Sequence, residues 1–336
     1  MKKLISIILV IVAIIFYRSD LKHEIYKLKD DLVKKYSSNE NANEDIHNNQ
    51  GDSHNTSDIY NLEKIKLGDS LDLILENLGN PGRIDDSEYG FKWYVYNQYS
   101  EVFAMVGIEN NIVVALYSNS IDSCESEGIK LNSNRDFVRE KYTTLEYKQK
   151  GNTRYIINSE NQYDIINKDK KYITIFYDIY ENNRVCSYQI ISEKVEDSIS
   201  GIYPNSNDDL RKSFELQIID LTNSVRQKKG LTTLDYNKKA TVSSRKHSED
   251  MRDRNFFDHI NKNNETPFDR MKKEGIIYTG AGENIAAGQT SAIYAHEAWM
   301  NSEGHRKNIL GDYKYIGVGV EFGGYYSTYY TQNFYI

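Results

Sequence analysis

The residues of this chain that could do chemistry are concentrated between Gly282 and Leu310. Glu283, Trp299 and His305 all fall within this stretch. A carboxylate and an imidazole that lie close together can bind a metal ion or form a hydrogen-bonded polar cleft. Upstream of the stretch, His259 lies at the edge of a predicted element, where a ligand could reach it. A functional site is therefore expected among these residues.

Two other chemical patterns in the same region are weak. His296-Glu297 resembles the start of the HExxH zinc-protease signature, but Met300 occupies the position of the second histidine. We therefore expect a surface pair on the helix before Trp299. A Ser-His-Asp hydrolase is also disfavoured, because the chain has no Gly-x-Ser-x-Gly motif and Ser302 lacks a strand-turn-helix context.

Helices are predicted on either side of the segment that leads to His259. The first begins at a cap on Asp208 or Asp209 and stops at Gly230, a residue suited to left-handed backbone. A later helix begins with Thr266 as its cap and ends at Gly275. These elements would form the frame of a folded domain in residues 206–336.

A further helix between these two has one apolar stripe that includes a histidine. Ala240, Ser244, His247 and Met251 recur at spacings of four, three and four, which places them on one inward face. A buried imidazole is tolerated once its nitrogens have hydrogen-bond partners. We favour a hydrogen-bonded core histidine at this position, and a site role stays open.

The start of the chain predicts a tether to a membrane. Residues 1–18 combine a basic start with an apolar run and lack a small-residue cleavage signal, so we expect an uncleaved signal anchor, an N-terminal membrane helix. The large domains would then be extracytoplasmic, and secretion after signal cleavage is the alternative. Residues 19–36 predict a short helical stalk, within which residues 20–36 could form a homodimer. Residues 37–58 are polar and predict a disordered linker.

Residues 59–200 contain an internal duplication. Ile65-Lys66-Leu67 recurs as Ile129-Lys130-Leu131, and each copy precedes a helical pattern and strand-like runs around an Asn-Asn turn. Asparagine tolerates the positive φ angles of tight hairpins. We predict two α+β units in a pseudo-symmetric arrangement, with helices that cover one face of an antiparallel sheet. An interdomain linker is expected from Ser192 to Asn207.

Charge and cysteine content exclude several classes of protein. The net charge of −7 includes no basic excess, so we expect no nucleic-acid partner. Cys124 and Cys186 are the two cysteines of the chain, which excludes a disulfide framework and a paired-cysteine metal site. Whether these two pair or stay free remains open, because the sequence carries no geometry.

Residues 210–336 resemble bacterial CAP (SCP/PR-1-like) domains. The motifs that carry the resemblance include Gly282-Glu283-Asn284-Ile285-Ala286, Trp299-Met300-Asn301-Ser302, Gly304-His305-Arg306 and Tyr330-Thr331-Gln332-Asn333-Phe334. Residues 59–200 resemble the domain that commonly precedes a CAP domain in bacterial proteins, especially from Ile65 to Gly82. The resemblance implies an α+β protein whose residues 206–336 form an α-β-α sandwich around an antiparallel sheet.

The resemblance also implies a cleft lined by two histidines and acidic residues. His259 matches the first histidine, Glu283 matches the acid of the Gly-Glu-Asn motif, and His305 matches the second histidine. In eukaryotic relatives the fourth member is a glutamate three residues after the tryptophan. This chain has Ser302 at that position, followed by Glu303. These five residues form the candidate cleft.

Such a cluster supports two kinds of chemistry. His259, His305 and Glu283 would suit Zn²⁺ or another divalent cation with an open position for water, whose pKa would fall towards about 7. Without a metal, the carboxylate would accept a hydrogen bond from an imidazole and raise its pKa, and the cleft would bind a ligand without reacting. Both interpretations use the same residues.

We expect a membrane-tethered extracytoplasmic CAP-domain protein whose cleft binds a cell-envelope component, a lipid or a partner protein. The alternative is a metal-assisted hydrolase that uses His259, His305 and Glu283. Binding is favoured because the fourth acidic position is altered and no nucleophile is evident. Catalysis is therefore not expected, and no catalytic residue is assigned.

Overall fold

The structure is a computed structural model that describes residues 59–99 and 102–336. Within these ranges, no helix has both the length and the apolar character needed to cross a bilayer. The described residues belong to one of the two compact units of the chain and contain two modules. The predicted signal anchor, the stalk with its homodimer, and the linker lie outside the described residues, at 1–18, 19–36 and 37–58.

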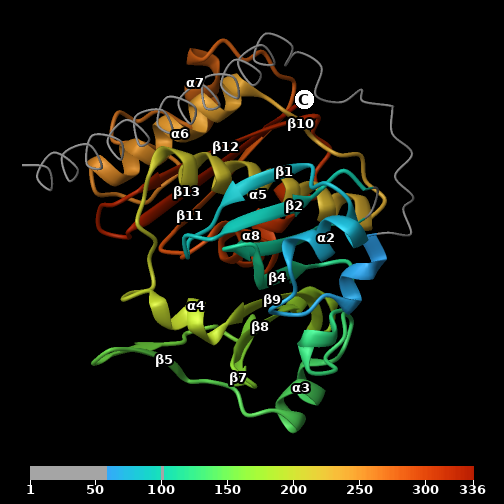
Figure 1. The fold of residues 1–336 in the computed structure, drawn as a ribbon. Coiled ribbons are helices and arrows are strands. Elements are labelled where there is room, and N and C mark those ends of the chain that lie inside the picture. The colour runs from blue at the N-terminus through green and yellow to red at the C-terminus, as the bar shows by residue number, and fades with distance from the viewer. Residues whose placement is uncertain (1–58, 100–101) are drawn as a thin grey trace, which may run out of the picture. The chain divides into compact units, whose positions relative to one another are not determined.

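The first module is built on an antiparallel sheet with the strand order β1-β2-β3-β4-β9-β8-β7 (Figure 1). Its strands are β1 (Arg83–Asp86), β2 (Lys92–Tyr96), β3 (Ala104–Glu109), β4 (Ile112–Ser118), β7 (Tyr163–Lys168), β8 (Lys171–Asp178) and β9 (Arg184–Ser192). A separate hairpin consists of β5 (Tyr147–Lys150) and β6 (Thr153–Ile156). The helical elements are η1 (Ile59–Lys64), α2 (Leu71–Leu78), η2 (Cys124–Ser126), α3 (Arg135–Lys141), η3 (Ile179–Glu181) and α4 (Glu193–Ser198).

The Asn-Asn turns form where the sequence predicted them. Asn110 and Asn111 adopt φ angles of 50° and 62° between β3 and β4, and Asn182 and Asn183 adopt 59° and 55° before β9. Equivalent backbone hydrogen bonds join each turn to the start of a helix: Gly68 N to Val113 O, Val113 N to Asp69 O and Leu71 N to Asn111 O, then Asn132 N to Val185 O, Val185 N to Ser133 O and Arg135 N to Asn183 O.

Both faces of the seven-stranded sheet are apolar, because successive strand residues point to opposite sides. Val106 of β3 faces the core that α2 and α3 complete, as the sequence predicted. Met105, its neighbour in β3, lies on the other face in a core that includes Leu221 and Ile293. These two residues belong to the second module. One module therefore covers a face of the other, which the sequence did not predict.

The second module is an α-β-α sandwich. Its sheet has the order β10-β12-β13-β11 and is antiparallel except for the β10–β12 pair. α6 packs on one face, and α5 and α8 pack on the other (Figure 1). The elements are α5 (Asp208–Lys228), β10 (Asp235–Tyr236), α6 (Lys238–Asp253), α7 (Pro267–Lys273), β11 (Ala281–Ala287), α8 (Ala292–Met300), α9 (Glu303–Ile309), β12 (Tyr315–Phe322) and β13 (Thr328–Tyr335).

The ends of the helices lie close to their predicted positions. Asn207 caps α5, rather than Asp208 or Asp209, because its side chain accepts a hydrogen bond from the first turn. Gly230 and Gly275 follow α5 and α7 with φ angles of 71° and 70°. Left-handed backbone at these two glycines ends both helices, as predicted.

Two glycines of β12 allow α6 to lie directly on the sheet. A Cβ atom at Gly317 would lie 2.2 Å from the backbone nitrogen of Thr241, and one at Gly319 would lie 2.0 Å from that of Arg245. Both distances are well inside van der Waals contact, so any side chain would push the helix away. This close approach sets the position of His247, which is on the same helix.

Polar contacts join the two modules as well. Arg83 of β1 forms an ion pair with Asp220 of α5 at 2.5 Å. Arg306 of α9 forms another with Asp178 of β8 at 2.9 Å. The side chain of Asn301 donates a hydrogen bond to a backbone carbonyl of β8 at 2.8 Å. The junction therefore contains both an apolar core and specific polar pairs.

The predicted linker is only partly irregular. Residues 193–198 form α4, in which Val195 and Glu196 are buried. Lys148 and Lys150 each form an ion pair with Glu196 at 2.8 Å. These contacts attach α4 to the first module and leave residues 199–207 as the irregular connection.

Candidate binding cleft

Glu283 is a buried carboxylate at the centre of the candidate site. It lies on β11 opposite Asn333 of β13, and its side chain is 1% exposed. Arg270 of α7 donates from Nη2 to both carboxylate oxygens, at 2.9 and 2.7 Å. Nδ1 of His259 lies 3.0 Å from Oε1 of the same carboxylate. Charge-assisted contacts therefore neutralise Glu283 and hold it in one orientation.

Arg270 also fixes the loop that carries the first histidine. Its Nη1 donates to the backbone carbonyl of His259 at 2.8 Å and to that of Glu265 at 2.9 Å. One guanidinium thus positions both the acid and the histidine. The role of this arginine could not be predicted from the sequence, because its contact with Glu283 depends on the packing of α7 against β11.

His305 lies in α9 and is held by Ser302. Its Nδ1 is 2.8 Å from Ser302 Oγ. Ser302 is the N-cap residue of α9, but its side chain makes no capping hydrogen bond. Burial lowers the pKa of His305, and a positive charge on His259 lowers it further. The His305 ring is therefore neutral at neutral pH, and the two histidines are close enough to influence each other.

The Gly-Glu-Asn motif connects β11 to α9. Asn284 Nδ2 donates to the carbonyl of His305 at 3.1 Å. Asn308 Nδ2 donates to the carbonyl of Glu283 at 3.1 Å and to Oδ1 of Asn284 at 2.9 Å. A Cβ atom at Gly282 would lie 2.9 Å from Asn308 Oδ1, so glycine allows α9 to approach the strand. The motif thereby places the second histidine next to the acid.

His247 is buried behind the acid. It is 0% exposed on the predicted inward stripe of α6. Its Nε2 donates to the carbonyl of Asp258 at 3.0 Å and lies 3.8 Å from Glu283 Oε1. Burial lowers the pKa of His247 to about 4, although the charge of Glu283 acts in the opposite direction. The predicted core histidine is therefore confirmed in its burial and in the hydrogen bond of Nε2, but in the described residues its buried Nδ1 has no hydrogen-bond partner. This histidine also packs on the site.

Glu303 does not join this network. It is exposed in the first turn of α9. Within residues 59–99 and 102–336, it forms no hydrogen bond or ion pair with His259, Glu283 or His305. The structure therefore brings together His259 and Glu283, places Ser302 against His305, and leaves Glu303 at the surface.

The residues present do not fit the three-ligand metal site that the sequence indicated. In the described part of the chain, no group of three or more His, Cys, Asp or Glu side chains is arranged to hold a metal ion. Both oxygens of Glu283 accept hydrogen bonds from Arg270, whose charge would repel a cation at that place. A divalent ion would have to be coordinated by His259 and His305 without this carboxylate.

The prediction of a surface pair at His296-Glu297 is wrong. His296 is 1% exposed and Glu297 is 7% exposed. Glu297 accepts hydrogen bonds from Ser187 Oγ at 2.5 Å and from Cys186 Sγ at 3.4 Å, both on β9. Cys186 is a free thiol, as is Cys124. α8 is buried between the two modules, and Glu297 therefore takes its hydrogen-bond partners from the first module.

His296 is expected to make the fold sensitive to acid. In the described residues neither ring nitrogen has a hydrogen-bond partner, and burial lowers its pKa to about 3. The unfolded chain takes up this proton near pH 6.5, but the folded chain does not until about pH 3, so stability is lost as the pH falls through that range. We expect His296→Leu to raise the urea midpoint more at pH 5 than at pH 7.5. An equal change at both pH values would contradict this assignment.

Two family models match the two modules. Residues 67–201 match the CAP-associated N-terminal model, and residues 219–334 match the model of the cysteine-rich secretory protein family. The chain is 31% identical over 290 residues to the uncharacterized membrane protein YlbC of Bacillus subtilis (strain 168), which covers 80% of this chain and 82% of YlbC. It is 48% identical over 124 residues to the uncharacterized protein YkwD of the same strain, which covers 36% of this chain and 47% of YkwD.

Solved structures share the fold. An extracellular protein containing a SCP domain from Bacillus anthracis str. Ames has a TM-score of 0.68 at 26% identity, and the match covers 86% of this chain and 98% of that one. A cysteine-rich secretory protein from Staphylococcus aureus subsp. aureus Mu50 has a TM-score of 0.65 at 16% identity, and the match covers 80% of this chain and 91% of that one. At this identity, the match supports a shared fold only. The resemblance in the motifs is thereby confirmed: the chain belongs to the CAP family of cysteine-rich secretory proteins, in the form that carries a CAP-associated N-terminal domain.

Proposed function

We propose that this protein is tethered to a membrane, lies outside the cytoplasm and uses the cleft of His259, Glu283 and His305 to bind a component of the cell envelope. The observation that carries this proposal is that both carboxylate oxygens of Glu283 accept hydrogen bonds from Arg270. A carboxylate held in this way is poorly placed to take up a proton as a general base. The cleft is therefore better suited to binding than to proton transfer.

The contact between Ser302 and His305 does not amount to a hydrolytic site. An activated serine needs a base that is itself oriented by a third group. In the described residues, no carboxylate forms a hydrogen bond or ion pair with His305. Ser302 serves to orient the imidazole, which supports a role for both side chains in binding.

The proposed tether and location rest on residues 1–18 and on the relatives. YlbC is named a membrane protein, and the Bacillus anthracis structure is described as that of an extracellular protein. The basic start and the apolar run without a small-residue cleavage signal support an anchor with the domains outside the cytoplasm. N-terminal sequencing of the mature protein would overturn the anchor if the sequence began after Ser19.

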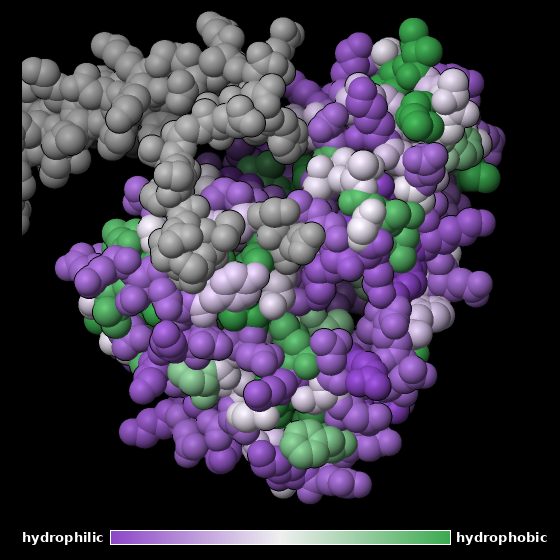
Figure 2. Space-filling model, turned by 90° about the vertical axis from the view of Figure 1, so that its right-hand side faces the viewer, coloured by the Kyte–Doolittle hydropathy of each residue, from purple (hydrophilic) through white to green (hydrophobic). Residues whose placement is uncertain are grey.

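Exposed apolar residues around the loop that carries His259 indicate the kind of ligand. The face of the molecule in Figure 2 is mainly hydrophilic. The second module also has exposed apolar side chains: Phe257 is 45%, Ile260 is 50% and Tyr325 is 76% exposed. The ring centroids of Phe257 and Tyr326 lie 6.0 Å apart, and His259 lies between Phe257 and Ile260 in the chain. Rings next to hydrogen-bonding imidazoles suit a ligand with both apolar faces and hydroxyl groups, so we propose an envelope glycan.

The test is co-sedimentation of the full-length protein with purified insoluble cell-wall glycan. We expect the double variant His259→Ala/His305→Ala to bind at least about tenfold more weakly, because each lost hydrogen bond contributes on the order of 1 kcal/mol. Lys307→Ala is the matched control, since Lys307 is exposed on the same helix as His305. Equal sedimentation of the double variant and the control would contradict the proposal.

A metal-assisted hydrolase that uses His259, His305 and Glu283 is the alternative, because these motif residues supply two imidazoles and one carboxylate. Zn²⁺ or another divalent cation bound there would supply an activated water. Calorimetry decides between the two: this alternative requires micromolar or tighter zinc binding that is lost in both His259→Ala and His305→Ala. If the folded protein takes up no zinc at neutral pH, the hydrolase is excluded.

We also infer that the first module contains an internal repeat. Isolated bridges pair Ser70 with Ile112 in one half and Asn134 with Arg184 in the other. In each half the bridge joins the N-cap of a helix to the first part of a strand that follows an Asn-Asn turn. The homodimer through residues 20–36 stays a prediction.

A further inference from the structure

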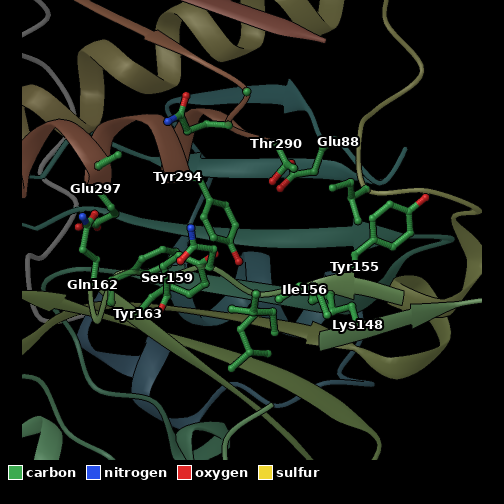
Figure 3. Close-up of a pocket in the computed structure, with 18 of the residues that line it drawn as sticks. Glu88, Lys148, Tyr155, Ile156, Ser159, Gln162, Tyr163, Thr290, Tyr294 and Glu297 are labelled. Carbon is green, nitrogen blue, oxygen red and sulfur yellow. The ribbon is translucent and has the colours of Figure 1, made fainter. Parts of the chain in front are cut away.

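A cavity of about 420 Å³ lies between the two modules and does not include the histidine cleft. Glu88, Tyr155 and Tyr163 of the first module line it together with Tyr294 of α8. Figure 3 shows the ring of Tyr294 projecting between Glu88 on one side and Tyr163 on the other. The volume falls in the range of sites for small ligands.

Three aromatic rings form one wall of this cavity. The ring centroids of Tyr163 and Phe176 lie 5.8 Å apart, and each of these two rings lies 5.2 Å from that of Tyr294. Tyr163 and Tyr294 are half-buried, so part of each ring remains accessible. The faces of aromatic rings carry a negative potential that attracts cations.

Glu88 adds a carboxylate that has no cationic partner. It accepts a long hydrogen bond from Gln189 Nε2 at 3.4 Å, and within the described ranges no lysine, arginine or histidine forms an ion pair with it. Lys148 also lines the cavity, but it forms an ion pair with Glu196, as Lys150 does, and none with Glu88. Burial raises the pKa of Glu88 to about 7, and the charge of Glu196 acts in the same direction. A cation in the cavity would provide the missing countercharge.

We propose that this cavity binds an organic ammonium ion, with its charged group at Glu88 and its apolar part against Tyr163 and Tyr294. A carboxylate combined with aromatic faces attracts an ammonium ion more strongly than a neutral or anionic group of the same size. The ammonium group belongs either to a free amine or to a lysine side chain of a peptide. Because the ligand touches both modules, its binding also stabilises their junction.

Calorimetry with the full-length protein at pH 8 tests this proposal. The probes are phenethylammonium as a free amine, Nα-acetyl-lysine amide as a peptide side chain, and neutral 2-phenylethanol as the isosteric control. We expect at least one of the two ammonium probes to bind at least tenfold more tightly than 2-phenylethanol, and the tighter of the two identifies the source of the ligand. If neither ammonium probe binds at least tenfold more tightly than 2-phenylethanol, the proposal is overturned.

Three substitutions locate the ligand. Glu88→Gln removes the charge at similar size, and we expect it to weaken binding of the ammonium probe at least tenfold. Glu140→Gln is the matched control, because Glu140 is an exposed carboxylate of α3 that does not line the cavity. Tyr163→Leu should weaken binding several-fold, and thermal unfolding will confirm that each variant is folded. Equal affinity in Glu88→Gln and Glu140→Gln would show that the cavity does not hold the cation at Glu88.

Discussion

Replacing Arg270 with methionine is expected to lower the free energy of unfolding by roughly 3–5 kcal/mol. Arg270 is 7% exposed and donates to both oxygens of Glu283, whose side chain is 1% exposed. Without the guanidinium, this carboxylate is buried without a strong countercharge. The backbone carbonyls of His259 and Glu265 also lose their donor. Urea denaturation at pH 7.5 measures the effect.

Two further variants control for this result. Arg254→Met removes an arginine that is 37% exposed and pairs with Asp250 one turn away, so we expect a cost of at most about 1 kcal/mol. Arg270→Met combined with Glu283→Leu removes both charges and should recover part of the lost stability. If Arg270→Met costs no more than Arg254→Met, the buried contact does not have the role assigned to it.

Truncation of Leu221 is expected to destabilise both modules together. Leu221 of α5 is 0% exposed and shares a core with Trp93 of the first module and Ile293 of α8. Leu221→Ala should cost roughly 2–5 kcal/mol, depending on how far the junction can collapse. The chain has two tryptophans, Trp93 in the first module and Trp299 in the second. Fluorescence of each, with the other replaced by phenylalanine, should report the same loss of stability.

Ile277→Ala is the matched control for this prediction. Ile277 is an apolar residue of the second module that is 95% exposed, so its truncation should change stability by no more than about 0.5 kcal/mol. If Leu221→Ala shifted the transition seen by Trp299 and left that of Trp93 in place, the modules would unfold independently. That result would contradict a shared core.

Features set by local backbone chemistry could be predicted from the sequence. The turns at Asn110-Asn111 and Asn182-Asn183 formed as expected, because few residues other than glycine and asparagine adopt their positive φ angles readily. Thr266 caps α7 in a reciprocal capping box with Asp269. The inward stripe of α6 that carries His247 is buried throughout. Each of these depends on residues within a few positions of one another.

Features that depend on distant burial could not be predicted in this way. α8 is buried on nearly all sides, so helical periodicity could not distinguish the face that carries His296 from the face that carries Glu297. The partners of Glu297 are more than a hundred residues away, on β9 and β4. From the helical patterns we predicted that helices cover one face of the seven-stranded sheet. These patterns carried no information about the second module, which covers the other face of the sheet.

The candidate site was predictable in its members but not in its connections. The motifs located His259, Glu283 and His305, and the structure places the first two in direct contact. The motifs did not show that Arg270 donates hydrogen bonds to both carboxylate oxygens of Glu283. Because of these contacts, Glu283 is suited to a buried ion pair and not to the coordination of a metal ion. Ser302 turned out to bind the histidine, whereas its neighbour in the sequence faces solvent.

The proposed function requires that the cleft bind an envelope glycan without the help of a metal. The most direct measurement is an NMR titration of histidine-labelled protein, with His259 and His305 assigned through their alanine variants. With soluble cell-wall glycan fragments, we expect the resonances of both residues to shift, those of buried His247 and His296 to stay in place, and micromolar Zn²⁺ to have no effect. Shifts of His259 and His305 with micromolar Zn²⁺, together with none on addition of glycan, would contradict the claim.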